Sequence, residues 1–415
     1  MTAFDLEYLD KLKTSVPAWR CAQMDAAYEV FAGMEEPTGA EEDWRYVDFD
    51  LPFSSLSPSH EPGDALVGGP FIGALDDTSG GATIVDGHVV TIDGEHVERL
   101  FGEREHSSPV PPDHNKLAAA HSAFATEGVH IDVAAGVAVD APIVVEVQGV
   151  AENVASFPHV IVDVGANAEV SVLVVYRSAD GRRLLMVPEI DLRVGVGGNL
   201  RFVSVQSLDF AASNVVHQRV HLGRDATSRI GEVGLGGDLA RLDLGITLEG
   251  DGSNSNFVGL FFGEGTQTLD YRMLIDHVGQ NTSSDVFLKG AVEDYAQSVF
   301  TGLLRIEKDA RKTSTFETNR NLVLSEHAKA HSVPNLEILC DDVICGHGSS
   351  VGPLEEDHLY YLQSRGLRKK RAERLLIRGF FTEVVDRLPI TAIAGPVSEE
   401  VFNRFVRAQE EGRVA

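Results

Sequence analysis

The sequence predicts a mainly β protein, in which a parallel β-helix is flanked by an N-terminal α/β lobe and a C-terminal helical domain. Short runs rich in β-branched residues recur from about residue 117 to residue 339, and each run is bounded by Gly, Asn, Asp or Pro. A β-sandwich normally ends near about 100 residues, whereas stacked short strands can continue over such a length. Because the aromatic share is only 7%, the core must consist mostly of Val, Ile, Leu and Ala, which suits stacked strands.

The N-terminal lobe is expected over residues 1–115. Apolar residues recur at helical spacing before Pro17, and a second helical stretch is expected around residues 24–34. Residues 52–112 are rich in Gly, Pro, Ser and Asp, with short alternating segments between residues 83 and 92. This mixture predicts a small α/β lobe followed by a linker.

The β-helix is expected over residues 116–352, with hardly a helical pattern between its strands. Clear strand candidates lie at residues 142–147, 159–164, 169–176 and 199–205. The repeats are irregular and have no strict hexapeptide period, which disfavours the left-handed β-helix of acyltransferases.

The helical domain is expected over residues 353–415. Pro353 can start a first helix, and Gly366 is suited to cap its C-terminal end. Apolar residues at helical spacing predict a second helix over residues 368–388, and a third is expected over 397–408.

Charge and composition exclude several classes of function. The formal net charge of -28 would repel phosphate, which argues against nucleic acid as a partner. The sequence shows no signal peptide and no apolar stretch of the roughly 18 residues that span a bilayer, so we expect a cytoplasmic protein without a membrane partner. With only three cysteines, a disulfide framework is implausible, and these thiols stay free for metal or redox chemistry.

Sequence motifs of common enzymes are missing as well. The chain has no Walker A loop, no dinucleotide-binding glycine fingerprint and no nucleophile elbow. The sequence therefore predicts no enzyme active site of its own, and any ATP hydrolysis must come from a partner.

Cys345 and His347 are the best candidates for metal ligands. They lie two residues apart, so on a strand their side chains leave on the same face, while Cys340 would point to the opposite side. Thiolate and imidazole are soft ligands for transition metals, and two of them do not complete a metal site, so the remaining ligands would have to come from elsewhere. The alternative is that Cys345 is a small buried hydrophobe and His347 a hydrogen-bonded turn residue.

Residues 335–352, together with 359–366, resemble the C-terminal signature of the SufB/SufD family of iron-sulfur cluster assembly scaffold proteins. Weaker agreements at residues 42–46, 128–142 and 318–325 extend the resemblance over nearly the whole chain. The tetrapeptide Cys-Gly-His-Gly that starts at Cys345 is similar to that of SufD-like members, and the short chain with few cysteines points the same way.

The resemblance implies a right-handed β-helix that pairs with a SufB-like paralogue through the solenoid ends. It also implies that His347 faces a cysteine of that paralogue, with Cys345 as a second candidate ligand. No cofactor is expected to be permanently bound, and a nascent iron-sulfur cluster or iron would be shared transiently with the partner. The C-terminal helices would dock onto the SufC ATPase.

A basic strip around Arg368 and Arg371 stands out on an acidic chain. It is either a solvated helix face or a surface that meets an acidic face of SufC, while Leu375, Phe380 and Val384 pack into a groove of that partner. The residues expected to bind SufC are Leu359, Tyr360, Arg365, Arg368, Arg371, Leu375 and Phe380.

Two other readings stay open at this point. The chain could be a SufB-like paralogue that acts as a homodimer with SufC, and homodimers of a SufD-like chain are possible when it is made alone. It could also be a carbohydrate-active β-helix enzyme, which would need clustered acidic residues on one solenoid face and usually a secretion signal.

Overall fold

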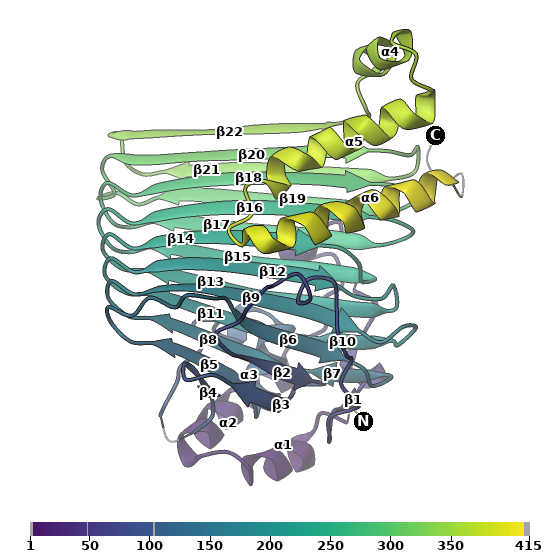
Figure 1. The fold of residues 1–415 in the computed structure, drawn as a ribbon. Coiled ribbons are helices and arrows are strands. Elements are labelled where there is room, and N and C mark those ends of the chain that lie inside the picture. The colour runs from purple at the N-terminus through teal and green to yellow at the C-terminus, as the bar shows by residue number, and fades with distance from the viewer. Residues whose placement is uncertain (1–2, 48, 103, 411–415) are drawn as a thin grey trace.

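The computed structural model describes residues 3–47, 49–102 and 104–410, and it confirms the predicted mainly β architecture (Figure 1). Strands stack in two long sheets that form a β-solenoid, and helices lie against its sides. The N-terminal helices lie toward one end of the stack and the C-terminal helices toward the other. Within the described ranges, no helix has both the length and the apolar character needed to cross a membrane.

The N-terminal lobe contains the predicted pair of helices and the predicted short strands. It is built from α1 (Leu6–Lys13), α2 (Ala18–Gly33), η1 (Glu42–Trp44), η2 (Phe53–Ser55), β1 (Ser57–Pro58), β2 (Gly81–Val85), β3 (His88–Asp93), β4 (Val97–Arg99), η3 (Pro112–His114) and α3 (Lys116–Phe124). Strand β2 pairs with β3 in antiparallel fashion, and it also joins the solenoid as a parallel neighbour of β6 (Ile143–Gly149). Strand β4 joins the other sheet, so the lobe contributes strands to both sheets of the solenoid.

Helix α3 departs from the sequence prediction, which places strands from residue 117 onward with hardly a helix between them. Every residue of α3 from 117 to 124 is buried, so this part of the helix has no solvent-exposed face. A helix that is buried on all sides lacks the 3.6-residue alternation of apolar and polar residues by which a helix is predicted from sequence. The prediction is wrong for this segment, and the first strand after α3 is β5, which begins at Val129.

In the first sheet of the solenoid, strands follow one another in sequence order from the N-terminal to the C-terminal end, and each turn of the solenoid adds one strand. After β4 its strands are β5 (Val129–Val133), β8 (His159–Val164), β11 (Glu189–Val194), β13 (Ala212–Leu222), β15 (Leu239–Leu248), β17 (Thr268–His277), β19 (Gln297–Ile306) and β21 (Lys329–Ile338). The short strands β7 (Val154–Ser156) and β10 (Leu184–Met186) form a side ladder with β1 and β13.

The second sheet faces the first and takes the alternate strands. After β3, β2 and β6 come β9 (Glu169–Ser178), β12 (Asn199–Ser207), β14 (Thr227–Gly234), β16 (Asn254–Gly263), β18 (Ser283–Val292), β20 (Thr313–Val323) and β22 (Val343–Gly352). Consecutive strands from β11 onward thus alternate between the sheets, and neighbours within each sheet are parallel and in register.

The turns between the sheets explain the Gly, Asn and Asp punctuation of the sequence. Asn167, Gly197, Asp225, Gly252 and Asn281 take left-handed conformations, with φ of 55°, 65°, 56°, 73° and 54°. Gly, Asn and Asp adopt this conformation at the lowest cost. The N–H of each donates to a carbonyl of the following turn at 2.8 to 2.9 Å, so the turns stack as regularly as the strands.

The space between the two sheets, here called the lumen, is filled mainly by Val, Ile, Leu and Phe. Ile190, Leu200, Phe202, Leu244 and Phe257 are almost fully buried there. Each such side chain contributes roughly 1.5 to 3 kcal/mol through its removal from water. Stacked strands thus supply a continuous core with few aromatic residues, as the composition predicts.

The C-terminal helices cover the outer side of the second sheet. They are α4 (Glu356–Ser364), α5 (Lys369–Val385), η4 (Thr391–Ile393) and α6 (Ala394–Glu410). Ile377 and Phe405 pack against Leu260 and other apolar residues of that sheet, and Arg404 Nη1 donates to Glu264 Oε1 at 2.9 Å. Helix α4 has no buried residue and projects beyond the end of the stack (Figure 1).

Candidate functional site

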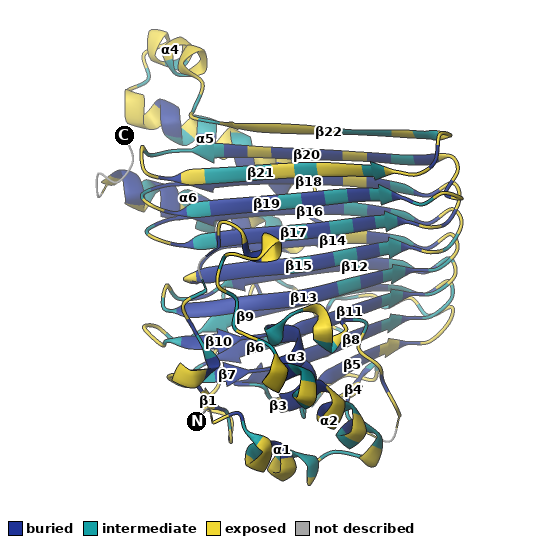
Figure 2. Cartoon of the chain, turned by 180° about the vertical axis from the view of Figure 1, so that it is seen from behind, coloured by how far each residue is buried: buried dark blue, intermediate teal, exposed yellow. Residues whose placement is uncertain are grey.

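The last turn of the solenoid is uncovered. Strands β21 and β22 end their sheets, so among the described strands each is paired on one side only. Figure 2 shows that burial is lost toward these two strands. Several large apolar side chains near this end are exposed, namely Phe316, Val333, Leu336, Ile338, Leu339, Ile344 and Val351. Folded chains usually protect such edges, so an apolar open edge indicates a surface made for a partner.

Cys345 and His347 lie on β22, at this open end. They are in register with Thr315 and Glu317 of β20, which are buried, while Phe316 between those two is exposed. Side chains that face each other across a parallel ladder point to the same side of the sheet. Cys345 and His347 therefore both lie on the lumen side of the last strand, with His347 exposed and Cys345 half-buried.

The lumen side of the last turn carries polar residues from three strands. Ser349 Oγ of β22 and Asn319 Nδ2 of β20 both donate to Ser332 Oγ of β21, at 2.7 and 2.8 Å. These hydrogen bonds cross the lumen and join the two sheets. His347 therefore lies beside these polar side chains, and its own side chain is exposed to solvent.

Cys340 does not point away from Cys345, so the predicted separation of the two thiols is wrong. Cys340 is buried with Ile306 and Ala310, and Cys345 packs against the same small cluster. Alternation along a strand does not extend to Cys340, because β21 ends at Ile338 and the chain turns before β22. Both cysteines are free thiols.

Glu317 is a residue of this end that sequence reasoning missed. Its side chain is buried one rung below His347, and burial raises its pKa to about 7. Across the lumen Gly302 leaves the room for it, since a Cβ at that position would clash with Glu317 Oε2. The signal was present in β20, where Thr315, Glu317 and Asn319 put polar residues at three consecutive inward positions.

Cys345 and His347 do not complete a metal site by themselves. In the described part of the chain, neither residue belongs to a group of three or more potential ligands whose ligand atoms lie close together. One thiol and one imidazole fall short of the typical four ligands of a cluster. The arrangement offers two soft ligands on an open surface and leaves the other coordination positions to a facing molecule.

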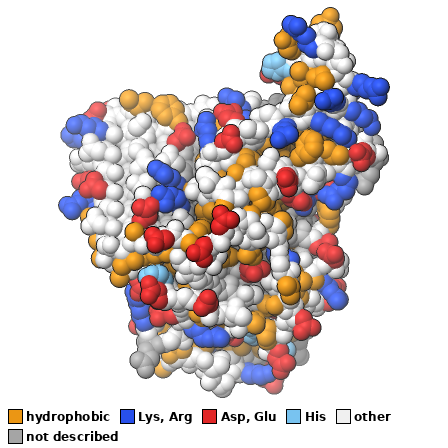
Figure 3. Space-filling view, viewed as in Figure 1, with side chains coloured by type: hydrophobic (Ala, Val, Ile, Leu, Met, Phe, Trp, Pro, Cys, Tyr) orange, Lys and Arg blue, Asp and Glu red, His pale blue; other side chains and the backbone are white. Residues whose placement is uncertain are grey.

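The helices beside the open end present the other predicted contact residues. Tyr360 is 76% exposed and Leu375 is 46% exposed, and Arg365, Arg368 and Arg371 are exposed too. These five residues are called the handle surface below. Figure 3 shows Lys and Arg side chains gathered on this part of the molecule. Leu359 is half-buried.

Val384 and Phe380, two apolar residues of α5, differ in how far they are buried. Val384 is fully buried against the second sheet, so the prediction that it packs into a partner's groove is wrong. The face of α5 that carries Val384 is the face that anchors the helix to its own solenoid. Phe380 is half-buried, and Lys289 Nζ lies over its ring in a cation–π contact, 4.4 Å from the ring centroid.

A cleft of about 870 Å³ separates α4 and α5 from the last strands of the second sheet. Its wall combines polar residues of β20 and β22 with apolar residues of α5, including Thr318, Arg320, Leu322, Ser350, Leu376 and Phe380. It lies between the handle surface and the open end, so a partner bound to one could reach the other.

Comparisons with known proteins point to one family. A family model described as the SufBD core domain of SUF system FeS cluster assembly matches residues 147–380. An iron-sulfur cluster assembly SufBD family protein of Mycobacterium leprae is 30% identical over 391 residues, which cover 92% of this chain and 93% of that protein. The iron-sulfur cluster assembly protein SufD of Bacillus subtilis is 31% identical over 306 residues, covering 71% of this chain and 70% of that protein. SufD of Escherichia coli is 28% identical over 244 residues, covering 58% and 57%.

Proposed function

This chain belongs to the SufBD family of SUF-system iron-sulfur cluster assembly proteins, and we propose that it is a SufD-like subunit of a cytoplasmic assembly scaffold. It pairs with a SufB-like paralogue through the open end of its solenoid and binds the SufC ATPase through its C-terminal helices. It has no enzyme active site of its own, and SufC hydrolyses the ATP. A cluster or iron is bound transiently as cargo, between this chain and its paralogue.

The observation that carries the proposal is the combination of an apolar open edge with two soft ligands on it. Strand β22 offers unpaired backbone groups, exposed apolar side chains and the pair Cys345 and His347 on a single surface. A second solenoid that stacks its own open end here would bury the apolar residues and pair the edges. It would also bring further ligands against His347.

The chemistry of the site follows from its residue types. A thiolate and an imidazole bind iron and can release it again, which a transient assembly site requires. The carboxyl group of Glu317, with a pKa near neutrality, can exchange a proton beneath His347 as ligands are gained and lost. A shared site opens when the two chains separate, and motion of SufC bound to the handle surface supplies that separation.

Charge reversal on the handle surface is expected to weaken SufC binding selectively. The variant Arg368→Glu/Arg371→Glu removes two exposed cations from an otherwise acidic chain and repels an acidic face of SufC. We expect co-purification of SufC from cells expressing all three proteins to fall by about tenfold or more, while the SufB-like paralogue stays bound.

The control variant Arg182→Glu/Arg224→Glu reverses two exposed arginines of the solenoid turns, whose side chains are 51% and 67% exposed. It should bind SufC as the unmodified chain does. Equal SufC recovery with both variants would contradict the docking surface. Failure of the unmodified chain to bind either protein would contradict the proposed function as a whole.

A further inference from the structure

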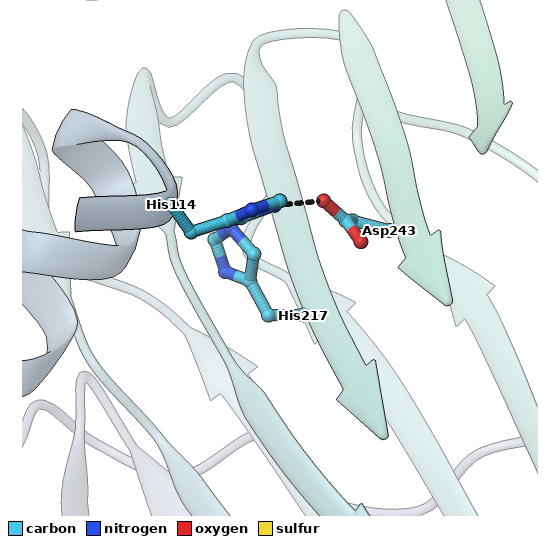
Figure 4. Close-up of side chains that lie close together, drawn as sticks. All are labelled: His114, His217 and Asp243. Atoms are coloured by element: carbon cyan, nitrogen blue, oxygen red, sulfur yellow. Dashed lines mark hydrogen bonds and ion pairs between the residues drawn. The ribbon is translucent and has the colours of Figure 1, made fainter. Parts of the chain in front are cut away.

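A second set of metal-type ligands lies away from the open end, where the N-terminal segment crosses the outer side of the first sheet. His217 of β13 and Asp243 of β15 are direct neighbours across the ladder. His114, at the end of η3, reaches over them from the lobe (Figure 4). In the strand order, β17, β19 and β21 separate this place from the end of the sheet.

The three side chains converge on one point. One ring nitrogen of each histidine and one carboxylate oxygen of Asp243 lie within 4.8 Å of one another. His114 Nε2 and Asp243 Oδ2 are 2.5 Å apart. A transition-metal ion lies about 2.0 to 2.2 Å from each ligand atom, which places the ligand atoms roughly 3 Å from one another. A small movement of the solvent-exposed His114 would bring the three ligand atoms to this spacing.

Neighbouring groups contact two of these residues, and one of them fixes the Asp243 carboxylate. Arg219 Nη1 donates to Asp243 Oδ1 at 3.0 Å and to the backbone carbonyls of Gln218 and Asp243 at 2.9 Å. This leaves Oδ2 as the oxygen that faces the histidines. Asn115 Nδ2 lies 3.2 Å from His217 Nε2, while Asn115 Oδ1 accepts from the Ala118 N–H and so caps α3. The Arg219 contact orients the Asp243 carboxylate as outer contacts orient metal ligands in proteins. The Asn115 amide donates to His217 Nε2, so an ion bound at that nitrogen would displace this hydrogen bond.

One turn lower, the same residue types make a closed arrangement that serves as an internal contrast. His159 and Glu189 are ladder neighbours of the same column, and His121 of α3 covers them. All three are buried, and both ring nitrogens of His121 are engaged, with Glu189 Oε2 at 3.0 Å and the Pro158 carbonyl at 3.2 Å. This lower group is a fully buried polar network.

We propose that His114, His217 and Asp243 form a binding site for a divalent first-row transition-metal ion. Two imidazoles and one carboxylate, beside exposed His114, form a donor set that takes ferrous iron or zinc in proteins. The nitrogen donors disfavour Mg²⁺ and Ca²⁺, which prefer all-oxygen sites. A bound ion would fasten η3 and the start of α3 to the solenoid. This goes beyond the proposed function, because the site uses no residue of the open end.

The test is anaerobic titration of the full chain with Fe²⁺ by equilibrium dialysis and with Co²⁺ by visible absorbance. The starting protein carries Cys345→Ser and His347→Ala, so that the open end contributes no soft ligand. We expect one equivalent of ion to bind, Mg²⁺ not to compete, and Co²⁺ to raise Tm because it binds the folded state. His114→Ala in this background should raise Kd by at least about tenfold and abolish the Tm shift.

His221→Ala is the matched control, because His221 lies on the same strand as His217 and faces Glu249 at 3.4 Å but belongs to neither group. It should bind Co²⁺ unchanged. Asp243→Asn removes a second ligand and should also weaken Co²⁺ binding. If Asp243→Asn unfolds, His114→Ala still tests the site, because His114 is exposed and its replacement should leave the fold intact. Absence of stoichiometric Co²⁺ in the starting protein, or equal Kd for His114→Ala and His221→Ala, would overturn the site. Neither result bears on pairing with a paralogue.

Discussion

Leu336→Asp is expected to abolish pairing with the SufB-like paralogue while leaving the chain folded. Leu336 lies on β21 in register with Leu304, and it is 36% exposed because no further turn covers it. In the isolated chain an aspartate here keeps contact with water. In the paired state its charge would be buried without a partner, which costs several kcal/mol. We expect Kd for the paralogue to rise by more than about a hundredfold, which corresponds to roughly 2.7 kcal/mol.

Analytical ultracentrifugation of the two mixed proteins measures this change, and circular dichroism checks the fold. Leu6→Asp is the control, since Leu6 is an exposed leucine, at 59%, on α1 toward the other end of the molecule. It should pair normally. An unimpaired heterodimer with Leu336→Asp would contradict end-to-end pairing. If the chain alone forms homodimers, the same variant should dissociate them, because a second copy would use the same edge.

His347→Ala is expected to lower cluster formation without disturbing assembly. The side chain is exposed on the lumen side of β22, so its loss leaves no cavity and removes one of the two candidate soft ligands of β22. We expect the iron and sulfide recovered on the complex with SufB-like and SufC partners to fall several-fold to tenfold after anaerobic reconstitution, read by absorbance and metal analysis. The amounts of the three proteins in the complex should not change.

His358→Ala is the matched control, because His358 is an exposed histidine, with 64% of its side chain accessible, on α4. It should give the normal cluster yield. His347→Cys, which restores a soft ligand, should recover part of that yield. Normal yield with His347→Ala would refute the assignment of His347. Cys345→Ser separates the two readings of that thiol, since a residue that only packs against Ile306 and Ala310 leaves the yield unchanged.

The β-solenoid could be predicted because its determinants are local. Runs of β-branched residues make strands, and Asn167, Asp225 and Gly252 mark turns whether or not the stacking is known. The C-terminal helices were predictable for the same reason, since Gly366, with φ of 90°, follows α4 as a cap. Helix α3 was not, because burial on every side erased its periodicity.

The site was only partly predictable. Which residues of one strand share a face follows from their spacing in the sequence, but which residues of neighbouring strands lie side by side does not. Cys345 and His347 share a face of β22 by spacing alone. That Glu317 lies beneath His347, and that His217 lies beside Asp243, depends on how many residues each irregular turn contains. No single segment of sequence carries that information. The separation of Cys340 from Cys345 was mispredicted on the same ground, since a turn interrupts the alternation between them.

The central claim is that the uncovered last turn of the solenoid is the surface on which this chain meets its paralogue. Hydrogen-exchange mass spectrometry of the chain alone and in the complex tests it most directly, because no described strand pairs with the outer edge of β21 or β22. The account predicts strong protection of residues 329–352 upon addition of the SufB-like paralogue alone. Unchanged exchange in residues 329–352, with protection elsewhere in a complex that does form, would contradict it.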